Sequence, residues 1–396
     1  MTARLSDLVP SLTDGVVGLR AHTLDDIGAI VEQARDPDSQ RWTSVPRGYP
    51  RDAAVGFLER VVTAWRDPAG DRLWAIEWID DARPRFGGTI EVRLGESADT
   101  AWLGFGLHPA ARGSGLMSRA VRLVAGQAFG TGLWGQPLAR LHWRAVVGNW
   151  PARRVAWATG FAFHGTLPAS HVDPSDPQGA ALDSWHASLA TGEVMAAPLP
   201  WFEPPVLEQG GIRLRPWRDE DIDCVEDRVD PAHWTPARSV LGREMFPRWL
   251  HSRRELMSQG TSVEWCVASA ATDRALGSVT VFSRAGAITG DVAELGYQLF
   301  PSARGHGAAT TAARLAIGHA LAPTHVGGLG LRRLVAGTAA DNTASNRVLQ
   351  ANGFVVYGRE HAVDPLPGGA YGDELHWELL PGRASGMVAS PGQEPR

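Results

Sequence analysis

Two short stretches carry the residues with the clearest chemistry. "HPAARGSGLMSRAV" begins at His108 and "FPSARGHGAATTAA" begins at Phe300, and both contain Pro-x-x-Arg-Gly-x-Gly between a strand-like and a helix-like segment. Glycines at the start of a helix leave backbone N–H groups open at the positive end of the helix dipole. Such a turn is typical of a site for a phosphate or pyrophosphate. Each stretch therefore predicts an anion site, beside which Arg112 and Arg304 would add positive charge.

Other phosphate-binding motifs do not fit this chain. It contains no GxxxxGK[ST], so a P-loop is excluded. A GxGxxG occurs at Gly130 to Gly135, but it follows a helix-like segment instead of a strand. A dinucleotide-binding fold is therefore not indicated.

The chain repeats itself at long range, which indicates a duplicated domain. Matching residues lie 192 or 193 positions apart: Arg112 and Arg304, Trp42 and Trp234, Asn149 and Asn342, Gly160 and Gly353. Between the copies, "APLPWFEPP" has the proline content of an extended linker. We expect one domain over residues 1–190, a linker over 191–210, a second domain over 211–381 and an unstructured tail over 382–396.

Each half alternates strand-like and helix-like segments in the same order. A short strand (Val16 to Arg20; Ile212 to Arg215) precedes two helical stretches, three strands, the glycine-opened helix, a strand, a short helix and two final strands. Strands and helices that mix in this way predict an α+β or α/β fold. We expect two tandem domains, each a twisted mixed sheet flanked by helices.

The composition indicates a soluble globular protein. Apolar residues make up 44% of the chain, charged residues 20%, and the formal net charge is −5, which favours neither nucleic acid nor an anionic membrane as a partner. No leader or membrane-spanning pattern is visible, so we expect a cytoplasmic protein. The two cysteines, Cys224 and Cys266, are too few for a disulfide framework and lack a metal-binding spacing.

The glycine phrase, with Asn-x-x-[SA] and a Gly-Phe further on, resembles the Gcn5-related N-acetyltransferase (GNAT) family. "RGSGLMSRAV" and "NTASNRVLQANGF" are most similar to ribosomal-protein acetyltransferases of the RimJ/RimL kind. The likeness covers both halves; Met117 departs from the family's usual Gly or Ala.

The resemblance implies acetyl-CoA as cosubstrate, with its pantetheine arm in a gap between two splayed central strands. The implied acetyl-CoA-binding residues are Arg112, Gly113, Ser114, Gly115, Leu116, Met117 and Asn149 in the first half, and Arg304, Gly305, His306, Gly307, Ala308, Ala309 and Asn342 in the second. Either asparagine would serve equally well as a helix cap.

The two halves differ where the chemistry requires side chains. By the resemblance, Glu294 takes the proton of the acceptor amine, Ser345 gives a proton to the CoA sulfur, and Tyr357 is another possible donor. The corresponding first-half residues are Trp102, Ala152 and His164, of which Trp102 and Ala152 cannot do this. We therefore expect the second half to be catalytic and the first to be an accessory domain, in which Glu91 is the one carboxylate that would have to supply a base.

The acceptor is expected to be an amine. A free α-amine has a reference pKa near ~8 against roughly 10.4 for lysine, so a single carboxylate base suits an α-amine better. With the RimJ/RimL likeness, this favours the N-terminus of a peptide or protein, including the precursor peptide of a natural product. Two alternatives stay open: an acetyltransferase for a small amine, such as an antibiotic or thiol-cofactor precursor, and a non-catalytic acyl-CoA-binding regulator. We expect a monomer with two such units, and the sequence leaves the oligomeric state open.

Overall fold

The computed structural model describes residues 5–43, 45–80, 83–171, 179, 181–227, 230–234 and 242–384. The chain divides into two compact units, Met1–Pro198 and Leu199–Arg396. The segment expected as a linker contributes a strand to the second unit, and its first residue pairs with the first unit through Thr191 N–H and the Ala139 carbonyl. Most of the expected tail, residues 385–396, lies outside the described residues.

In the first unit, the described strands form one mixed sheet in the order β1-β2-β3-β4-β5-β6-β8-β7. Only β5 and β6 are parallel neighbours. The strands are β1 Leu12–Thr13, β2 Val17–Arg20, β3 Arg72–Asp80, β4 Arg83–Leu94, β5 Thr100–Leu107, β6 Arg140–Val146, β7 Ala162–His171 and β8 Leu182–Ala190. The helices are α1 Leu5–Leu8, α2 Ile27–Arg35, α3 Pro37–Trp42, α4 Arg51–Arg66, α5 Leu116–Phe129 and α6 Trp150–Ala158.

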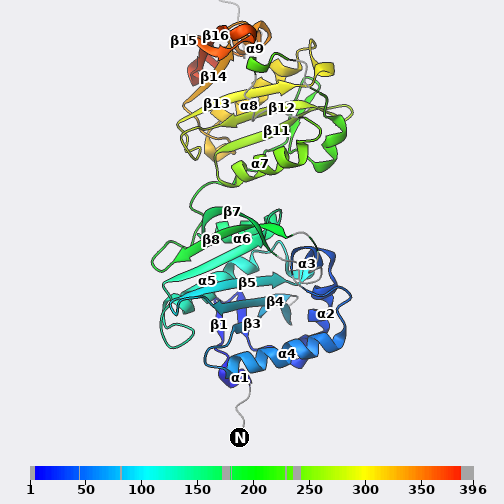
Figure 1. Ribbon diagram of the computed structural model, residues 1–396, viewed down its shortest axis with the longest axis vertical. Helices are drawn as coiled ribbons and strands as arrows, with labels where there is room; N and C mark the ends of the chain where they lie inside the picture. The colour runs from blue at the N-terminus through cyan, green and yellow to red at the C-terminus, as the bar shows by residue number, and fades with distance from the viewer. Residues whose placement is uncertain are drawn as a thin grey trace, which may run out of the picture. The chain divides into compact units, whose positions relative to one another are not determined.

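The second unit repeats this plan, with the described strands in the order β15-β16-β14-β13-β12-β11-β10-β9 (Figure 1). Here β13 and β14 are the parallel pair. The strands are β9 Leu207–Gln209, β10 Ile212–Arg215, β11 Ser262–Ser269, β12 Ala275–Phe282, β13 Val292–Leu299, β14 Arg333–Ala339, β15 Val355–Pro365 and β16 Tyr371–Leu379. The helices are α7 Phe246–Ser258, α8 Ala308–Leu321, α9 Thr343–Ala351 and α10 Pro381–Ala384.

Before the three central strands, the second unit differs from the sequence expectation of two helical stretches. Its described residues form one α-helix here, α7, and two short 3-10 helices, Asp219–Cys224 and Ala232–Trp234. The first unit has three α-helices at this place, α2, α3 and α4, and each sheet has a short strand before the expected first one, β1 and β9. From the three central strands to the two final strands, the order agrees with the expectation, and the α+β fold with tandem domains is confirmed.

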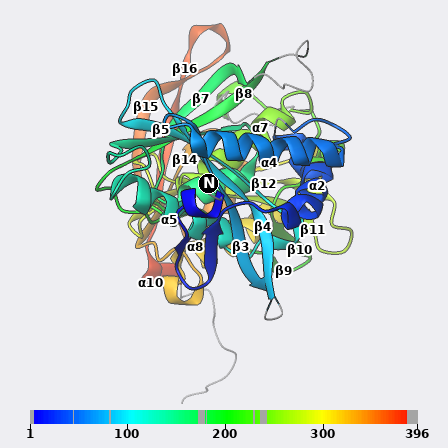
Figure 2. The same cartoon turned by 90° about the horizontal axis from the view of Figure 1, so that it is seen from below.

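The side chains of each strand alternate between the two faces of its sheet, and helices cover both faces. In β3, Trp74 and Ile76 pack in the core under α5, whereas Ala75 packs with α2 and α4 on the other face. Figure 2 shows α2 and α4 together on one side of the first unit's strands. In β11, Val263 and Trp265 pack under α8, and residues of the opposite register face α7.

The parallel pair at the centre of each sheet is joined over only part of its length. In the second unit, backbone pairing of β13 with β14 ends at Glu294 and Val335, although β13 continues to Leu299 and β14 to Ala339. In the first unit, pairing of β5 with β6 ends at Leu103. The unpaired strand ends are the gap that the family resemblance implies.

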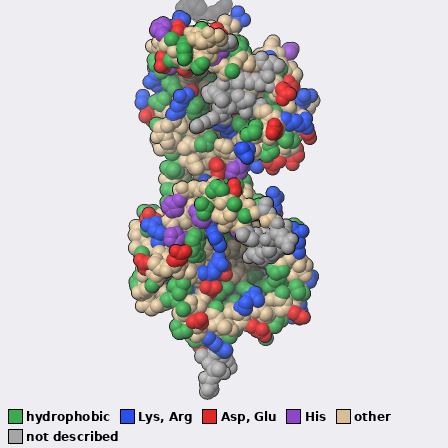
Figure 3. Space-filling model, viewed as in Figure 1, with side chains coloured by type: hydrophobic (Ala, Val, Ile, Leu, Met, Phe, Trp, Pro, Cys, Tyr) green, Lys and Arg blue, Asp and Glu red, His purple; other side chains and the backbone are tan. Residues whose placement is uncertain are grey.

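The surface carries charges of both signs, interspersed on the face in Figure 3. No helix in the described part of the chain is long and apolar enough to span a bilayer.

Candidate functional site

The glycine loops have the same backbone geometry in both units. Gly115 caps α5 with φ 77° and ψ 2°, and Gly307 caps α8 with the same values. Gly113 and Gly305, two residues earlier, also have positive φ, at 76° and 82°. At all four glycines, a Cβ would meet nothing within 4 Å. Each loop thus leaves open space in front of the first helical N–H groups, which have no partner within the helix.

Among the loop residues named from the sequence, the structure separates exposed from buried ones. The three residues at each tip are exposed: Gly113, Ser114 and Gly115 in the first unit, Gly305, His306 and Gly307 in the second. Leu116, Met117 and Ala308 are buried, and Ala309 is half-buried. Met117, in the first turn of α5, is 2% exposed and its side chain packs into the core, so its size does not obstruct the loop.

The two loop arginines do not stand free beside the anion site. The Arg112 guanidinium donates to Asp36 at 2.5 Å and to Ser39 at 3.1 Å, where α2 meets α3. Arg304 makes a two-point ion pair with Asp230, with N–O distances of 2.6 and 2.8 Å. Both arginines therefore tie the glycine loop to the preceding helical segment. Their binding to a phosphate stays a prediction, and in this structure each guanidinium is paired with an aspartate.

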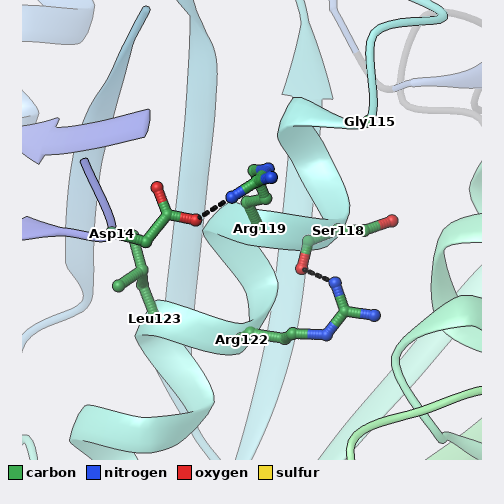
Figure 4. A pocket seen from close by; sticks show the side chains of 6 residues that line it. All are labelled: Asp14, Gly115, Ser118, Arg119, Arg122 and Leu123. Carbon is green, nitrogen blue, oxygen red and sulfur yellow. Dashed lines mark hydrogen bonds and ion pairs between the residues drawn. The ribbon is translucent and has the colours of Figure 1, made fainter. Parts of the chain in front are cut away.

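A shallow pocket flanks the first loop on the outer side of α5 (Figure 4). It is lined by Asp14, Gly115, Ser118, Arg119, Arg122 and Leu123. Arg119 donates to the Asp14 carboxylate at 2.7 Å. Arg122 donates to the Met195 and Ala158 carbonyls at 3.1 and 2.7 Å. Both cations thus have partners within the first unit.

The gap between β13 and β14 opens into a cavity of about 560 Å³ in the second unit. Its walls come from both splayed strands, from the start of α9 and from the 3-10 helix at Ala232–Trp234. Trp234 is the last residue of this 3-10 helix, and residues 235–241 lie outside the described residues. Its indole N–H donates to Asp341 at 2.9 Å, in the turn before α9.

Glu294 and Ser345 both line this cavity. Glu294 lies on β13 at the last paired position, and both of its oxygens contact Arg284, at 2.9 and 2.8 Å. Ser345 lies in the first turn of α9, where its backbone N–H donates to the Asn342 side chain at 3.1 Å. The structure thus brings the two residues to one cavity from different elements.

Asn342 and Asn149 are both helix caps. Asn342 lines the cavity and caps α9, and Asn149 caps α6 by accepting from Ala152 N–H at 3.2 Å. Tyr357 lies elsewhere, on the outer strand β15. Its ring is 54% exposed, lies 5.0 Å from the Arg333 guanidinium, and is not part of the cavity lining.

Tyr297 is a residue of the cavity that the sequence argument missed. Its hydroxyl donates to the Ser345 carbonyl at 2.9 Å, and burial raises its pKa. It therefore connects β13 to the start of α9 across the gap. The sequence contains a sign of this difference between the halves. Tyr297 lies three residues after Glu294, and the matching residue of the first half is Phe105, which lacks the hydroxyl.

Glu264, on β11, is a second residue that sequence reasoning did not find. It is 2% exposed and lines the cavity. Burial raises its pKa to about 7, although the nearby Arg253 acts in the opposite direction. The sequence signal is weak, because Glu264 is one carboxylate in an otherwise apolar strand.

Two more carboxylates line the same cavity, Asp364 and Glu374. Burial raises the pKa of both; Asp341 adds to the effect at Asp364, and Asp364 and Glu294 add to it at Glu374. The cavity wall is therefore richer in carboxylates than in cations, which suits an amine as the second substrate.

The corresponding region of the first unit has a different chemistry. Trp102 occupies the position of Glu294, and its ring lies 5.1 Å from that of His142 and 6.1 Å from that of His186. Arg144, at the position of Gly337, lies 5.5 Å from the Trp102 ring. Burial lowers the pKa of both histidines. This part of the first unit thus presents an aromatic ring and basic groups where the second presents carboxylates.

The cysteines do not form a nucleophilic site. Cys266 is fully buried on β11, and burial raises its pKa, which disfavours the thiolate. Direct transfer to an amine therefore suits the site better than a covalent acetyl-cysteine.

Solved structures that resemble one unit of this chain include RimL, described as a ribosomal L7/L12 alpha-N-protein acetyltransferase. It is 15% identical, with 48% of this chain and 99% of that chain covered and a TM-score of 0.40. Ribosomal-protein-S5-alanine acetyltransferase from Vibrio fischeri is 21% identical, with 44% and 96% covered and a TM-score of 0.38. RimJ from Mycobacterium smegmatis, in complex with CoA-disulfide, is 21% identical, with 46% and 86% covered and a TM-score of 0.37. A comparison with curated proteins gives no match.

A family model decides the identity. The model described as "Acetyltransferase (GNAT) domain" matches residues 17–162 and, a second time, residues 212–355. Both matches include a glycine loop and a splayed strand pair of the kind described above. The chain belongs to the GNAT family of acetyltransferases, as an acetyl-CoA-dependent N-acetyltransferase with two tandem domains.

Proposed function

We propose that the protein acetylates the N-terminal α-amine of a peptide or protein, and that the second unit does so. The observation that carries this proposal is the cavity at the β13–β14 gap, which has Glu294 and Ser345 in its lining. It adjoins the strand that leads into the second glycine loop. The first unit has Trp102 and Ala152 at the two matching positions.

Each group has a role that follows from its place. The loop from Arg304 to Ala309, with its open helical N–H groups, would hold the pyrophosphate of acetyl-CoA. Acetyl-CoA supplies an activated acetyl group as a thioester. Glu294 would receive the ammonium form of the acceptor and draw off its proton, directly or through water. Ser345, in the first turn of α9, would return a proton to the sulfur. Tyr357 lies outside the cavity lining, so the proposal gives it no part.

An α-amine acceptor fits the carboxylate-lined cavity. A free α-amine, with its reference pKa near ~8, loses its proton to a carboxylate far more readily than lysine, near ~10.4. A peptide that is bound by its N-terminal amine continues in one direction only. The rest of the peptide can therefore extend out of the open side of the cavity while the amine stays bound.

The test is CoA release from acetyl-CoA in the presence of short peptides. Each peptide is supplied with a free and with an already acetylated N-terminus, and lysine side chains are present in some and absent in others. We expect turnover only with a free N-terminus, independent of lysine, and mass spectrometry should place the new acetyl group on the α-amine. Turnover on lysine, or on small primary amines but no peptide, would overturn the proposed acceptor. Acetyl-CoA binding without turnover on any amine would favour the regulatory alternative.

A further inference from the structure

Glu264 lies at the inner wall of the second unit's cavity and has no part in the mechanism so far. It is on the face of β11 that packs against α7, opposite the face that packs against α8. Only 2% of the residue is exposed, although it lines the cavity. A carboxylate is seldom this deeply buried unless it is paired.

The sheet register connects Glu264 to the gap where the acetyl group must be transferred. Glu264 pairs with Thr280 on β12, and Thr280 pairs with Gly296 on β13. Directly paired residues point to the same face of a sheet, and neighbouring strands lie about 4.8 Å apart. Glu264, Thr280 and Gly296 therefore form one row across the sheet, on the same face. Because Gly296 has no side chain, Thr280 carries the one side chain in this row between Glu264 and the splayed end of β13.

The ion pair of Glu264 is long, and the Ser278 and Thr280 side chains of β12 also stabilise its carboxylate and lower its pKa. Arg253 of α7 is its ion-pair partner, at 3.9 Å between Nε and Oε2, which is beyond hydrogen-bond distance. Arg253 Nε is itself buried without a hydrogen-bond partner among the described residues. The Arg253 guanidinium is thus close enough to attract the Glu264 carboxylate but does not fix its orientation by a hydrogen bond.

Glu294 is held quite differently. Both of its oxygens contact Arg284, whose side chain is 74% exposed. A carboxylate engaged at two points by a guanidinium has its orientation fixed. Glu294 is therefore well placed to orient an ammonium group, whereas Glu264 faces the same cavity with its oxygens unfixed by Arg253.

We propose that Glu264, in place of Glu294, accepts the proton of the acceptor amine, and that the Glu294–Arg284 pair receives and orients that amine. This inference rests on the proposed function of the second unit. The ammonium R–NH3+ gives one proton to the Glu264 carboxylate, directly or through a water molecule in the cavity. The neutral amine then forms the C–N bond to the acetyl carbon as the C–S bond breaks, and its second proton goes to the departing CoA sulfur. The Glu264 carboxyl releases its proton to solvent before the next turnover.

The ionisable groups around Glu264 define what a pH experiment should show. Those that line the same cavity are Arg253 from α7, Arg284 after β12, Glu294 and Tyr297 from β13, Asp364 from β15, Glu374 from β16 and His233 before α7. Glu264 has to be ionised to accept a proton, so transfer should become faster as the pH rises through the pKa of about 7. Arg253 lowers that pKa, so removing this cation should move the inflection to higher pH.

The experiment measures single-turnover acetyl transfer to a peptide with a free N-terminus between pH 5.5 and 9. The variants are Glu264→Gln, Arg253→Met and, as a control, Glu59→Gln. Glu59 is an exposed carboxylate on α4 of the first unit. We expect Glu264→Gln to be at least tenfold slower at pH 7 and to lose the inflection near 7, Arg253→Met to keep the inflection but at higher pH, and Glu59→Gln to match the wild type.

A purely structural role for Glu264 predicts another result. In that case Glu264→Gln would lower the rate, or the amount of folded protein, without moving the inflection, and Arg253→Met would leave it in place. Either result overturns the inference, and the Arg253→Met arm decides it if Glu264→Gln does not fold. If the wild type acetylates small amines but no peptide, the proposed acceptor is wrong, and the same comparison on that amine still decides the role of Glu264. A wild type that acetylates neither overturns both.

Discussion

At the scale of single residues, the second unit's cavity separates two carboxylates by their surroundings. Glu294 is oriented by Arg284, and Glu264 is buried with a distant cation. Two groups of the same chemistry can take different parts in one reaction when their environments differ in this way. The first unit has neither arrangement, because Trp102 and Leu73 stand at the corresponding positions of the repeat.

Glu264 should also affect the pH dependence of stability. Its carboxyl ionises near 4.5 in the unfolded chain but near 7 in the folded protein, so the unfolded state binds fewer protons between these values. Stability should therefore fall as the pH rises through this window, by about 3 kcal/mol for this group alone. In Glu264→Gln this contribution is absent, so the melting temperature should fall less between pH 5 and 8 than in the wild type.

Thermal unfolding at several pH values checks this, with Glu59→Gln on the exposed side of α4 as the control. The control should follow the wild type. Parallel pH profiles of Glu264→Gln and the wild type would show that Glu264 does not keep its proton in the folded state.

At the scale of elements, the glycine loop between β13 and α8 has the backbone conformation that the proposed anion site requires. Gly307 has positive φ and begins α8, and Gly115 does the same for α5. A residue with a side chain is strained in this left-handed conformation, whereas glycine is not. The shared backbone geometry explains why the same phrase occurs twice in the sequence, whatever the first loop binds.

Replacing these two glycines by alanine should separate strain from binding. Gly307→Ala and Gly115→Ala should each lower stability by about 1–2 kcal/mol, because both force a left-handed conformation on alanine. Only Gly307→Ala should raise the KM for acetyl-CoA, because its methyl group projects into the open space before the helix of the active unit. Steady-state kinetics with unfolding curves on both variants measures this. An equal rise in KM for Gly115→Ala would mean that the first loop serves the reaction.

The elements also show what sequence could predict. The repeat, most of the order of elements along the chain and the two glycine turns could be predicted from periodicity and spacing. The partner of Arg112 did not, because Asp36 lies 76 residues away and the pairing depends on where α2 ends. Glu264 did not either, because one carboxylate in "SVEWCVAS" becomes informative only when α7 covers that face of β11 and the cavity extends to it. Tyr297 could have been found, since the repeat replaces it by Phe105.

At the scale of the whole molecule, the chain carries two copies of one fold whose central regions have diverged. The second unit has a carboxylate-lined cavity, and the first has Trp102, Arg144 and two histidines in the matching region. Both retain the glycine loop. The proposed division of labour explains this pattern as duplication followed by loss of catalytic groups in the first unit.

The most direct test of this account is acetyl transfer to a free peptide N-terminus by Glu294→Ala compared with Trp102→Ala, the same position in the other unit. We predict that Glu294→Ala slows transfer about a hundredfold, because the acceptor amine is no longer oriented at the β13–β14 gap, and that Trp102→Ala keeps the wild-type rate. Loss of transfer in Trp102→Ala, with Glu294→Ala unaffected, would contradict the assignment of the chemistry to the second unit.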